Sequence, residues 1–199
     1  HEGIILLRDY GFTPQEYKAL KPGDDAMHLL HLDQPILEIN ITPDRGYAFS
    51  YRGVAREYHH STGAKFVDPV TELNKRAPAA PAVESGVSSD IEVIVDDNNP
   101  IHGVTGCDRY VARAIHGFDP TNHTPNWMRR RLIRAGMRSI SLAVDVTNYV
   151  MLDLGQPMHA YDLDKIEGPI VVRRAAEGEK LTTLDGKEHD LSVEDLLIT

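Results

Sequence analysis

The 199-residue sequence contains little cysteine and no long apolar run. Cys107 is its single cysteine, so the chain can form neither an internal disulfide nor a zinc site built from cysteines. Low cysteine content is typical of proteins that work in the reducing cytoplasm. No stretch of about 18 consecutive apolar residues occurs, and the apolar run near the N-terminus is too short for a signal peptide. We therefore expect a cytoplasmic protein that does not enter a membrane.

Common nucleotide-binding and hydrolase motifs are also missing. The sequence has no G-x-G-x-x-G or G-x-x-x-x-G-K-[ST] phosphate loop and no G-x-S-x-G nucleophile elbow. Its ten histidines are scattered, without an H-x-x-x-H or H-E-x-x-H zinc spacing. His28 and His31 lie close in sequence, and His59 and His60 are adjacent, but we interpret both pairs as ordinary surface or core histidines. We expect this chain to bind neither a metal nor a cofactor.

The charge balance is acidic. The formal net charge is −9, and no block of Lys and Arg dominates the sequence. This balance argues against DNA binding and against a general nucleic-acid coat protein, although a local basic face can still contact a phosphate backbone. The paired carboxylates Asp24-Asp25 and Asp96-Asp97 stand beside turn residues, and we interpret them as solvated caps. Apolar runs at both ends of the sequence predict that it is a piece of a longer chain.

The first segment, residues 1–70, mixes strand and helix patterns. Residues 3–7 ("GIILL") and 35–46 ("PILEINITPDRG") are predicted strands, the second because its apolar and polar side chains alternate. One helix is predicted after Thr13, which can cap it, and another over about residues 50–60. The next stretch, residues 71–90, is rich in Ala, Pro and Ser. It is predicted to be a linker, with an ordered surface loop as the alternative.

The patterns of the second segment, residues 91–199, predict strands, helices and a hairpin. The predicted strands are residues 91–97, 107–118, 139–146 and 170–175, the helices are residues 125–135 and 147–154, and the hairpin is residues 180–191, turning at Asp185-Gly186. The elements alternate irregularly rather than as strict strand–helix repeats. This irregularity favours an α+β fold with two mixed α/β units over a doubly wound sheet.

The helix predicted over residues 125–135 is rich in arginine. Arg130 and Arg134 are one helical turn apart and therefore share a face, with Arg129 and Arg131 beside them. One interpretation is a solvated amphipathic helix. The other is a patch that contacts RNA phosphates in an otherwise acidic protein.

Residues 144–162 ("VDVTNYVMLDLGQPMHAYD") hold the strongest candidate site. The Gly-Gln-Pro turn at residues 155–157 can bring His159 back towards Thr147 and Asn148. An asparagine amide can stabilise an oxyanion, and a neutral histidine can accept a proton or orient a water near neutral pH. Such a cluster can hydrolyse an ester. On chemistry alone, however, the favoured interpretation is a capped helix with an ordinary core histidine.

These residues also carry a family resemblance. Residues 37–57 ("LEINITPDRGYAFSYRGVARE") and 144–168 ("VDVTNYVMLDLGQPMHAYDLDKIEG") resemble the β subunit of bacterial phenylalanyl-tRNA synthetases. The segments between and after them fit the same family in order and spacing, so the resemblance covers nearly the whole chain. It implies that residues 1–70 are the end of an inserted OB module and the later part of a B1-like domain. It implies that residues 91–199 are most of a B3/B4-like editing domain.

The resemblance further implies a function. In this family the B3/B4 domain hydrolyses tyrosine wrongly esterified to the phenylalanine tRNA, while synthesis with ATP and magnesium takes place mainly on the α subunit of a cytoplasmic α2β2 tetramer. Matched by motif, Thr147, Asn148 and His159 correspond to residues that line the editing pocket. Many family members have Asn-Asn where this chain has Ser141-Leu142. In the family, a later glycine-rich segment carries an acidic residue associated with tyrosine recognition. The given sequence stops at Thr199, before that segment, so we expect little editing from this piece alone.

A non-catalytic role is the alternative function. The region can instead be a scaffold of the tetramer that holds tRNA, with Arg130 and Arg134 as contacts to its phosphates.

Overall fold

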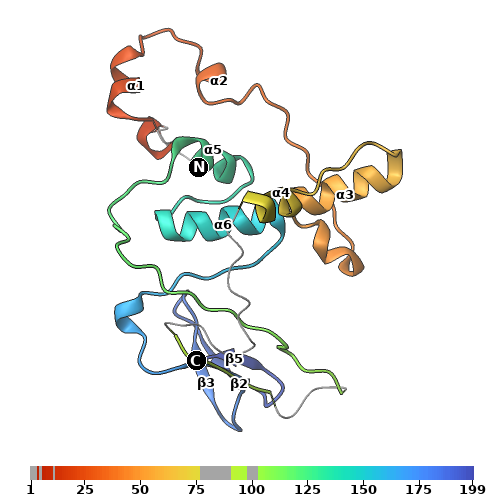
Figure 1. The fold of residues 1–199 in the computed structure, drawn as a ribbon. Helices are drawn as coiled ribbons and strands as arrows, with labels where there is room; N and C mark the ends of the chain where they lie inside the picture. Colours follow the sequence, from red (N-terminus) through yellow and green to blue (C-terminus); the bar gives the residue numbers. More distant parts are fainter. Residues whose placement is uncertain (1–3, 5, 11, 77–90, 98–102) are drawn as a thin grey trace. The chain divides into compact units, whose positions relative to one another are not determined.

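The computed structural model describes residues 4, 6–10, 12–76, 91–97 and 103–199, drawn in colour in Figure 1. Two compact units form. The first combines His1–Arg76 with Asp119–Ala160, and the second combines Ala77–Phe118 with Tyr161–Thr199. The predicted α+β class is confirmed, because helices and mixed sheets are both present. The predicted domain limits at residues 70 and 90 stay a prediction.

The described part of the first unit is helical. Its elements are η1 (Leu7–Tyr10), α1 (Pro14–Ala19), α2 (Ala26–Leu29), η2 (Pro43–Ala48), α3 (Tyr51–Thr62), α4 (Pro69–Arg76), α5 (Asn126–Arg134) and α6 (Leu142–Leu154). Helix α6 packs against both α3 and α5, and α5 also contacts η1 (Figure 1). Every described helix of the chain is too short or too polar to cross a bilayer.

Capping residues explain where the predicted helices begin. Thr13 and Glu16 form a reciprocal capping box at the start of α1: Glu16 N donates to Thr13 Oγ1 at 3.3 Å, and Thr13 N donates to Glu16 Oε2 at 2.6 Å. Asp25 caps α2, as its position beside a turn indicated, by accepting from Met27 N at 2.9 Å. Helix α3 begins after Ser50, so both helices predicted in the first segment are confirmed.

Three predicted strands are wrong. Residues 35–42 have no regular structure, and 3-10 helix η2 follows; residues 107–118 also form no strand. Both segments alternate in sequence, but neither is paired with a described strand, and an isolated strand leaves its backbone groups without partners. In the predicted strand over residues 139–146, residues 142–146 instead belong to α6, which Ser141 caps by accepting from Val144 N at 3.4 Å. Short apolar runs do not distinguish a strand from a buried helix.

A fourth predicted strand is also wrong, and the predicted linker is helical at its start. In the predicted strand over residues 3–7, the described residues Ile4 and Leu6 are irregular and Leu7 starts η1. Residues 71–76 of the predicted linker belong to α4, which ends in two basic residues that suit a helix C-terminus. Residues 77–90 lie outside the described residues.

The second unit holds two small sheets. Strands β1 (Val93–Asp96), β2 (Ile170–Arg174) and β5 (Leu196–Ile198) form one sheet in the order β1-β2-β5, with β1 parallel and β5 antiparallel to β2. Strands β3 (Lys180–Thr182) and β4 (Glu188–Asp190) form an antiparallel hairpin (Figure 1). The strands predicted over residues 91–97 and 170–175 and the hairpin are therefore confirmed.

A buried ion pair closes one end of the larger sheet. The Arg174 guanidinium donates from Nε to Asp97 Oδ1 at 2.8 Å and from Nη2 to Oδ2 at 3.1 Å. These bonds, with a backbone bond from Gly106, hold the pKa of Asp97 below its usual value. The interpretation of Asp97 as a solvated cap is wrong, because only 7% of the residue is exposed. Gly106 approaches this pair closely, since an added Cβ would lie 2.7 Å from Arg174 Nη2 and would displace that guanidinium.

Candidate functional site

Helix α6 positions two of the three predicted catalytic residues. Thr147 and Asn148 are consecutive residues of this helix, and both are half-buried. Thr147 Oγ1 donates to Val144 O at 2.8 Å, so its hydroxyl hydrogen is used within the helix. A hydroxyl oxygen keeps acceptor lone pairs after donating. Thr147 can therefore accept a hydrogen bond from a ligand that carries an N–H or O–H group.

The helix ends where the sequence indicated. Gly155 adopts a left-handed conformation, with φ of 81°, and donates from its N–H to Met151 O at 2.9 Å. A glycine takes this conformation without steric cost and reverses the chain after a helix. Gly155 also approaches α3, because an added Cβ would lie 3.0 Å from Ser50 Oγ. The turn after α6 is thus held by its own cap and by close packing.

His159 lies four residues beyond this cap, and its side chain is exposed. It belongs to the same compact unit as Thr147 and Asn148. The structure therefore presents His159 to solvent on the segment that leaves α6. The grouping of the three side chains in one editing pocket stays a prediction.

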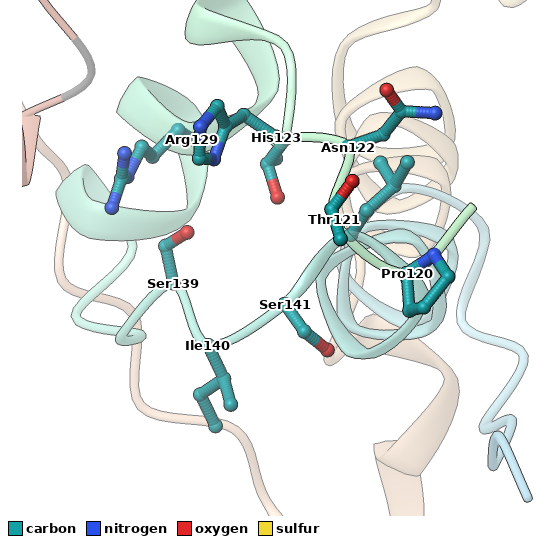
Figure 2. Close-up of a pocket in the computed structure, with 10 residues that line it drawn as sticks. Pro120, Thr121, Asn122, His123, Arg129, Ser139, Ile140 and Ser141 are labelled. Carbon is teal, nitrogen blue, oxygen red and sulfur yellow. The ribbon is translucent and has the colours of Figure 1, made fainter. Parts of the chain in front are cut away.

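A cavity of about 210 Å³ lies elsewhere in this unit. Figure 2 shows its two walls: residues 120–123 precede α5, and residues 139–141 precede α6, with Arg129 to one side. Thr124 and Leu142 complete the lining, which is mainly polar and does not include Thr147, Asn148 or His159. The Ser141-Leu142 pair thus lines this cavity.

A buried carboxylate joins the two walls of this cavity. Asp145 is 0% exposed and accepts hydrogen bonds from the Thr124 hydroxyl, from Ser139 Oγ at 2.5 Å and from Ile140 N at 2.9 Å. Thr124 stands directly before Pro125, where a threonine often caps a helix, but its hydroxyl is bound to Asp145 and does not cap α5. The network was not predicted, although an acidic residue within the apolar run "LAVDV" is a signal of a buried charge.

Arg130 and Arg134 share one face of α5, as predicted, and this face is turned to the N-terminal segment. Arg130 Nη2 lies 3.7 Å from Glu16 Oε1, and its guanidinium stacks over the Phe12 ring with Cζ 5.0 Å from the centroid. Arg134 donates to the Gln34 side chain. These contacts fasten residues 12–34 to α5. A role of the two arginines in binding tRNA stays a prediction.

Arg131, also on α5, contacts two aromatic rings. We call Trp127, Arg131 and Tyr149 the aromatic cluster. The Trp127 and Tyr149 rings meet edge to face, with centroids 5.2 Å apart and planes at 89°. Arg131 Cζ lies 5.9 Å from the Trp127 centroid and 6.0 Å from that of Tyr149. Its Nη1 donates to the Tyr149 hydroxyl at 2.7 Å. Trp127 nevertheless remains 54% exposed.

The histidine pairs show no metal-binding geometry. The His28 and His31 rings lie 6.4 Å apart and the His59 and His60 rings 5.4 Å apart, both as tilted ring contacts. Within the described ranges, no group of three or more His, Cys, Asp or Glu side chains is placed to hold an ion. That the chain binds no metal or cofactor stays a prediction.

Comparison with known proteins adds to this geometry. Residues 106–199 match the B3/4 domain family. Over its full length the chain is 79% identical to the phenylalanine–tRNA ligase beta subunit of Bifidobacterium longum strain NCC 2705, of which it covers 23%. It is 50% identical to the corresponding subunit of Leifsonia xyli subsp. xyli, of which it covers 22%. Against that of Streptomyces avermitilis it is 49% identical over 99% of its length, covering 21% of that protein. The chain therefore spans less than a quarter of these relatives.

Proposed function

Because this chain belongs to the phenylalanine–tRNA ligase beta-subunit family, we propose that it supplies part of an editing site in such an enzyme. The reaction is hydrolysis of the ester that joins tyrosine to the phenylalanine tRNA. The observation that carries this proposal is the B3/4 match over residues 106–199, a range that contains Thr147, Asn148 and His159.

The reaction needs a water, a base and a group that stabilises negative charge. His159, exposed after the α6 turn, accepts a proton from the water as the water oxygen attacks the ester carbonyl. The tetrahedral intermediate then collapses, the bond to the ribose oxygen breaks, and that oxygen takes the proton. Tyrosine and uncharged tRNA are the products. No covalent enzyme intermediate is required.

The two residues on α6 have different roles in this scheme. The Asn148 amide donates to the carbonyl oxygen, where negative charge develops. Thr147, whose hydroxyl hydrogen is bound to Val144 O, acts as an acceptor. The substrate's α-ammonium group is a donor that fits this role. Thr147 and Asn148 thus orient the ester, while His159 provides the base.

Selectivity for tyrosine over phenylalanine requires recognition of the phenolic hydroxyl. A site built to hydrogen-bond a hydroxyl discriminates strongly against the analogue without it, because the polar groups of the site are then left unpaired. The proposed partners follow from the same role: the phenylalanine tRNA and the synthetase α subunit in a cytoplasmic α2β2 tetramer. Synthesis with ATP and magnesium would take place on the α subunit.

The test uses the complete beta subunit in its tetramer. His159→Ala should slow the clearance of tyrosyl-tRNA by about 10²–10⁴-fold, the usual contribution of a general base. His60→Ala, an exposed histidine at the end of α3, is the matched control and should clear tyrosyl-tRNA normally. Clearance by the His159 variant at the wild-type rate would show that His159 is not the base.

The alternative, a scaffold that binds tRNA through Arg130 and Arg134, is less well supported. Both guanidinium groups contact the N-terminal segment, which leaves them less available to phosphates. Under this alternative, tRNA affinity would fall steeply with salt, and Arg130→Gln with Arg134→Gln would reduce that slope. An unchanged slope would argue against it.

A further inference from the structure

The aromatic cluster on α5 and α6 has no role in the proposed hydrolysis, yet two of its members, Trp127 and Arg131, are exposed. Its three side chains are held together by the edge-to-face ring contact and by the Arg131–Tyr149 hydrogen bond. Aromatic rings and guanidinium planes are the groups on which unpaired bases stack. Since Trp127 remains 54% exposed, a flat ligand can lie on it without disturbing these contacts.

The charge around the cluster suits a nucleic acid. Helix α5, with the sequence "NWMRRRLIR", has no acidic residue, and of its four arginines Arg131 lies in the cluster, whereas Arg130 and Arg134 contact the N-terminal segment. A local basic surface on an acidic protein attracts a phosphate backbone to that surface. Stacking on Trp127 combined with nearby positive charge is the usual arrangement for binding single strands.

The cluster also lies close to the proposed editing residues along the chain of α6. Tyr149 directly follows Asn148 on this helix, so the two differ by about 1.5 Å in height and lie within one helix diameter, about 10–12 Å, of each other. A tRNA carries its amino acid on a single-stranded 3′ end. A strand whose terminal ester reaches Asn148 therefore has its preceding bases within reach of Tyr149 and Trp127.

We propose that Trp127, Arg131 and Tyr149 form a stacking surface for unpaired bases at the 3′ end of the tRNA. This inference rests on the proposed function, because editing is what brings that end to α6. Trp127 provides the exposed ring, and Arg131, held by the Tyr149 hydroxyl, adds positive charge beside it.

The test uses the single tryptophan of the chain as its own probe. A single-stranded oligoribonucleotide that ends in CCA and carries no amino acid should quench Trp127 fluorescence, and the quenching should saturate as the oligonucleotide concentration rises. With a labelled oligonucleotide at fixed salt, Trp127→Ala should raise Kd about fivefold or more, whereas Trp127→Phe should retain most of the affinity because it keeps an aromatic face. Circular dichroism should show that both variants retain α5.

Tyr58→Ala is the matched control, because Tyr58 on α3 is a similarly exposed aromatic outside the cluster, at 62%. The absence of quenching, or equal Kd changes for Trp127→Ala and Tyr58→Ala, would overturn the proposal. The proposal would also be overturned if, in the complete subunit, Trp127→Ala weakened binding of the α subunit but not of the oligonucleotide. The cluster would then be a contact between proteins. If Trp127→Ala does not fold, the proposal is tested by the quenching of wild-type Trp127 and by whether Trp127→Phe retains most of the affinity.

The two proposals fail separately. The oligonucleotide carries no ester, so its binding does not depend on His159 chemistry. Normal clearance by His159→Ala with clear quenching of Trp127 would reject the catalytic assignment alone. Normal editing without quenching would reject the stacking surface alone.

Discussion

The hydroxyl of Thr124 donates a hydrogen bond to the buried carboxylate of Asp145, 21 residues later in the chain. This contact joins the loop before α5 to the first turn of α6. Ser139 and Ile140, in the loop between the two helices, donate to the same carboxylate. A single acidic side chain thus fixes both loops relative to the helix that carries Thr147 and Asn148.

Asp145→Asn should therefore destabilise the chain. The amide has the size of the carboxylate but has one acceptor oxygen, so donors that now bind Asp145 lose their partners. Loss of hydrogen bonds to a buried charge should lower the free energy of unfolding by about 2–4 kcal/mol, measured by urea denaturation. Asp153→Asn, in the last turn of α6, is the control and should change it by less than about 0.5 kcal/mol. Equal midpoints for the two variants would contradict the assigned role of Asp145.

The turn that leads to His159 can be tested through its glycine. Gly155→Ala should lower the free energy of unfolding by about 1–2 kcal/mol because φ is 81°. It should lower it further because the new Cβ would press on Ser50 Oγ. Gly63→Ala is the matched control: its φ is 72°, but nothing lies within 4 Å of the added Cβ. Thermal unfolding of both variants separates the cost of the left-handed backbone, which both share, from the cost of the contact with Ser50, which only Gly155→Ala has. A loss no greater at Gly155 than at Gly63 would show that the α3–α6 contact is not tight.

How far the sequence predicted this structure depends on whether a local signal was available. Thr13 and Gly155 act locally, so the limits of α1 and α6 that they set could be predicted. The strand predicted over residues 35–46 failed because alternation indicates a strand only where a second strand pairs with it. Pairing is a long-range property that a single segment does not contain.

The same distinction applies to the candidate site. Thr147, Asn148 and His159 lie within one short stretch with a turn between them, but the resemblance of that stretch to the synthetase β subunit, rather than the spacing, is what favoured them as a site. The Asp145 network joins residues from three segments, and the aromatic cluster joins Trp127 to Tyr149 across two helices. No periodicity relates such positions, so only the structure shows their contact. Equally, the sequence showed that Arg130 and Arg134 share a face but not that this face meets Glu16 and Gln34.

Arg130→Gln should loosen the N-terminal segment. The substitution removes the ion pair with Glu16 and the stacking over Phe12, so α1 should detach more often from α5. A protease that cleaves after lysine should then cut after Lys18, within α1, several-fold faster than in the wild type. Arg138→Gln, an exposed arginine just beyond α5, is the control and should leave cleavage unchanged. Unaltered cleavage of the Arg130 variant would mean that these contacts do not hold the segment.

Acid stability should depend on Glu179 in the second unit. Arg173 donates to both oxygens of this carboxylate, at 2.9 and 2.8 Å, and with the Ala176 N–H lowers the pKa of Glu179 from 4.5 to about 2. The unfolded chain binds a proton near pH 4.5 and the folded chain only near pH 2, so the stabilisation is present above pH 4.5 and is lost as pH falls through about 2. In urea unfolding at pH 7, 4.5 and 3, Glu179→Gln should lower the midpoint most at pH 7 and progressively less at lower pH. Glu177→Gln, at an exposed neighbour, is the control, and its difference in urea midpoint from the wild type should not shrink as the pH falls. A midpoint difference between wild type and Glu179→Gln that stays constant at all three pH values would contradict the assigned pKa.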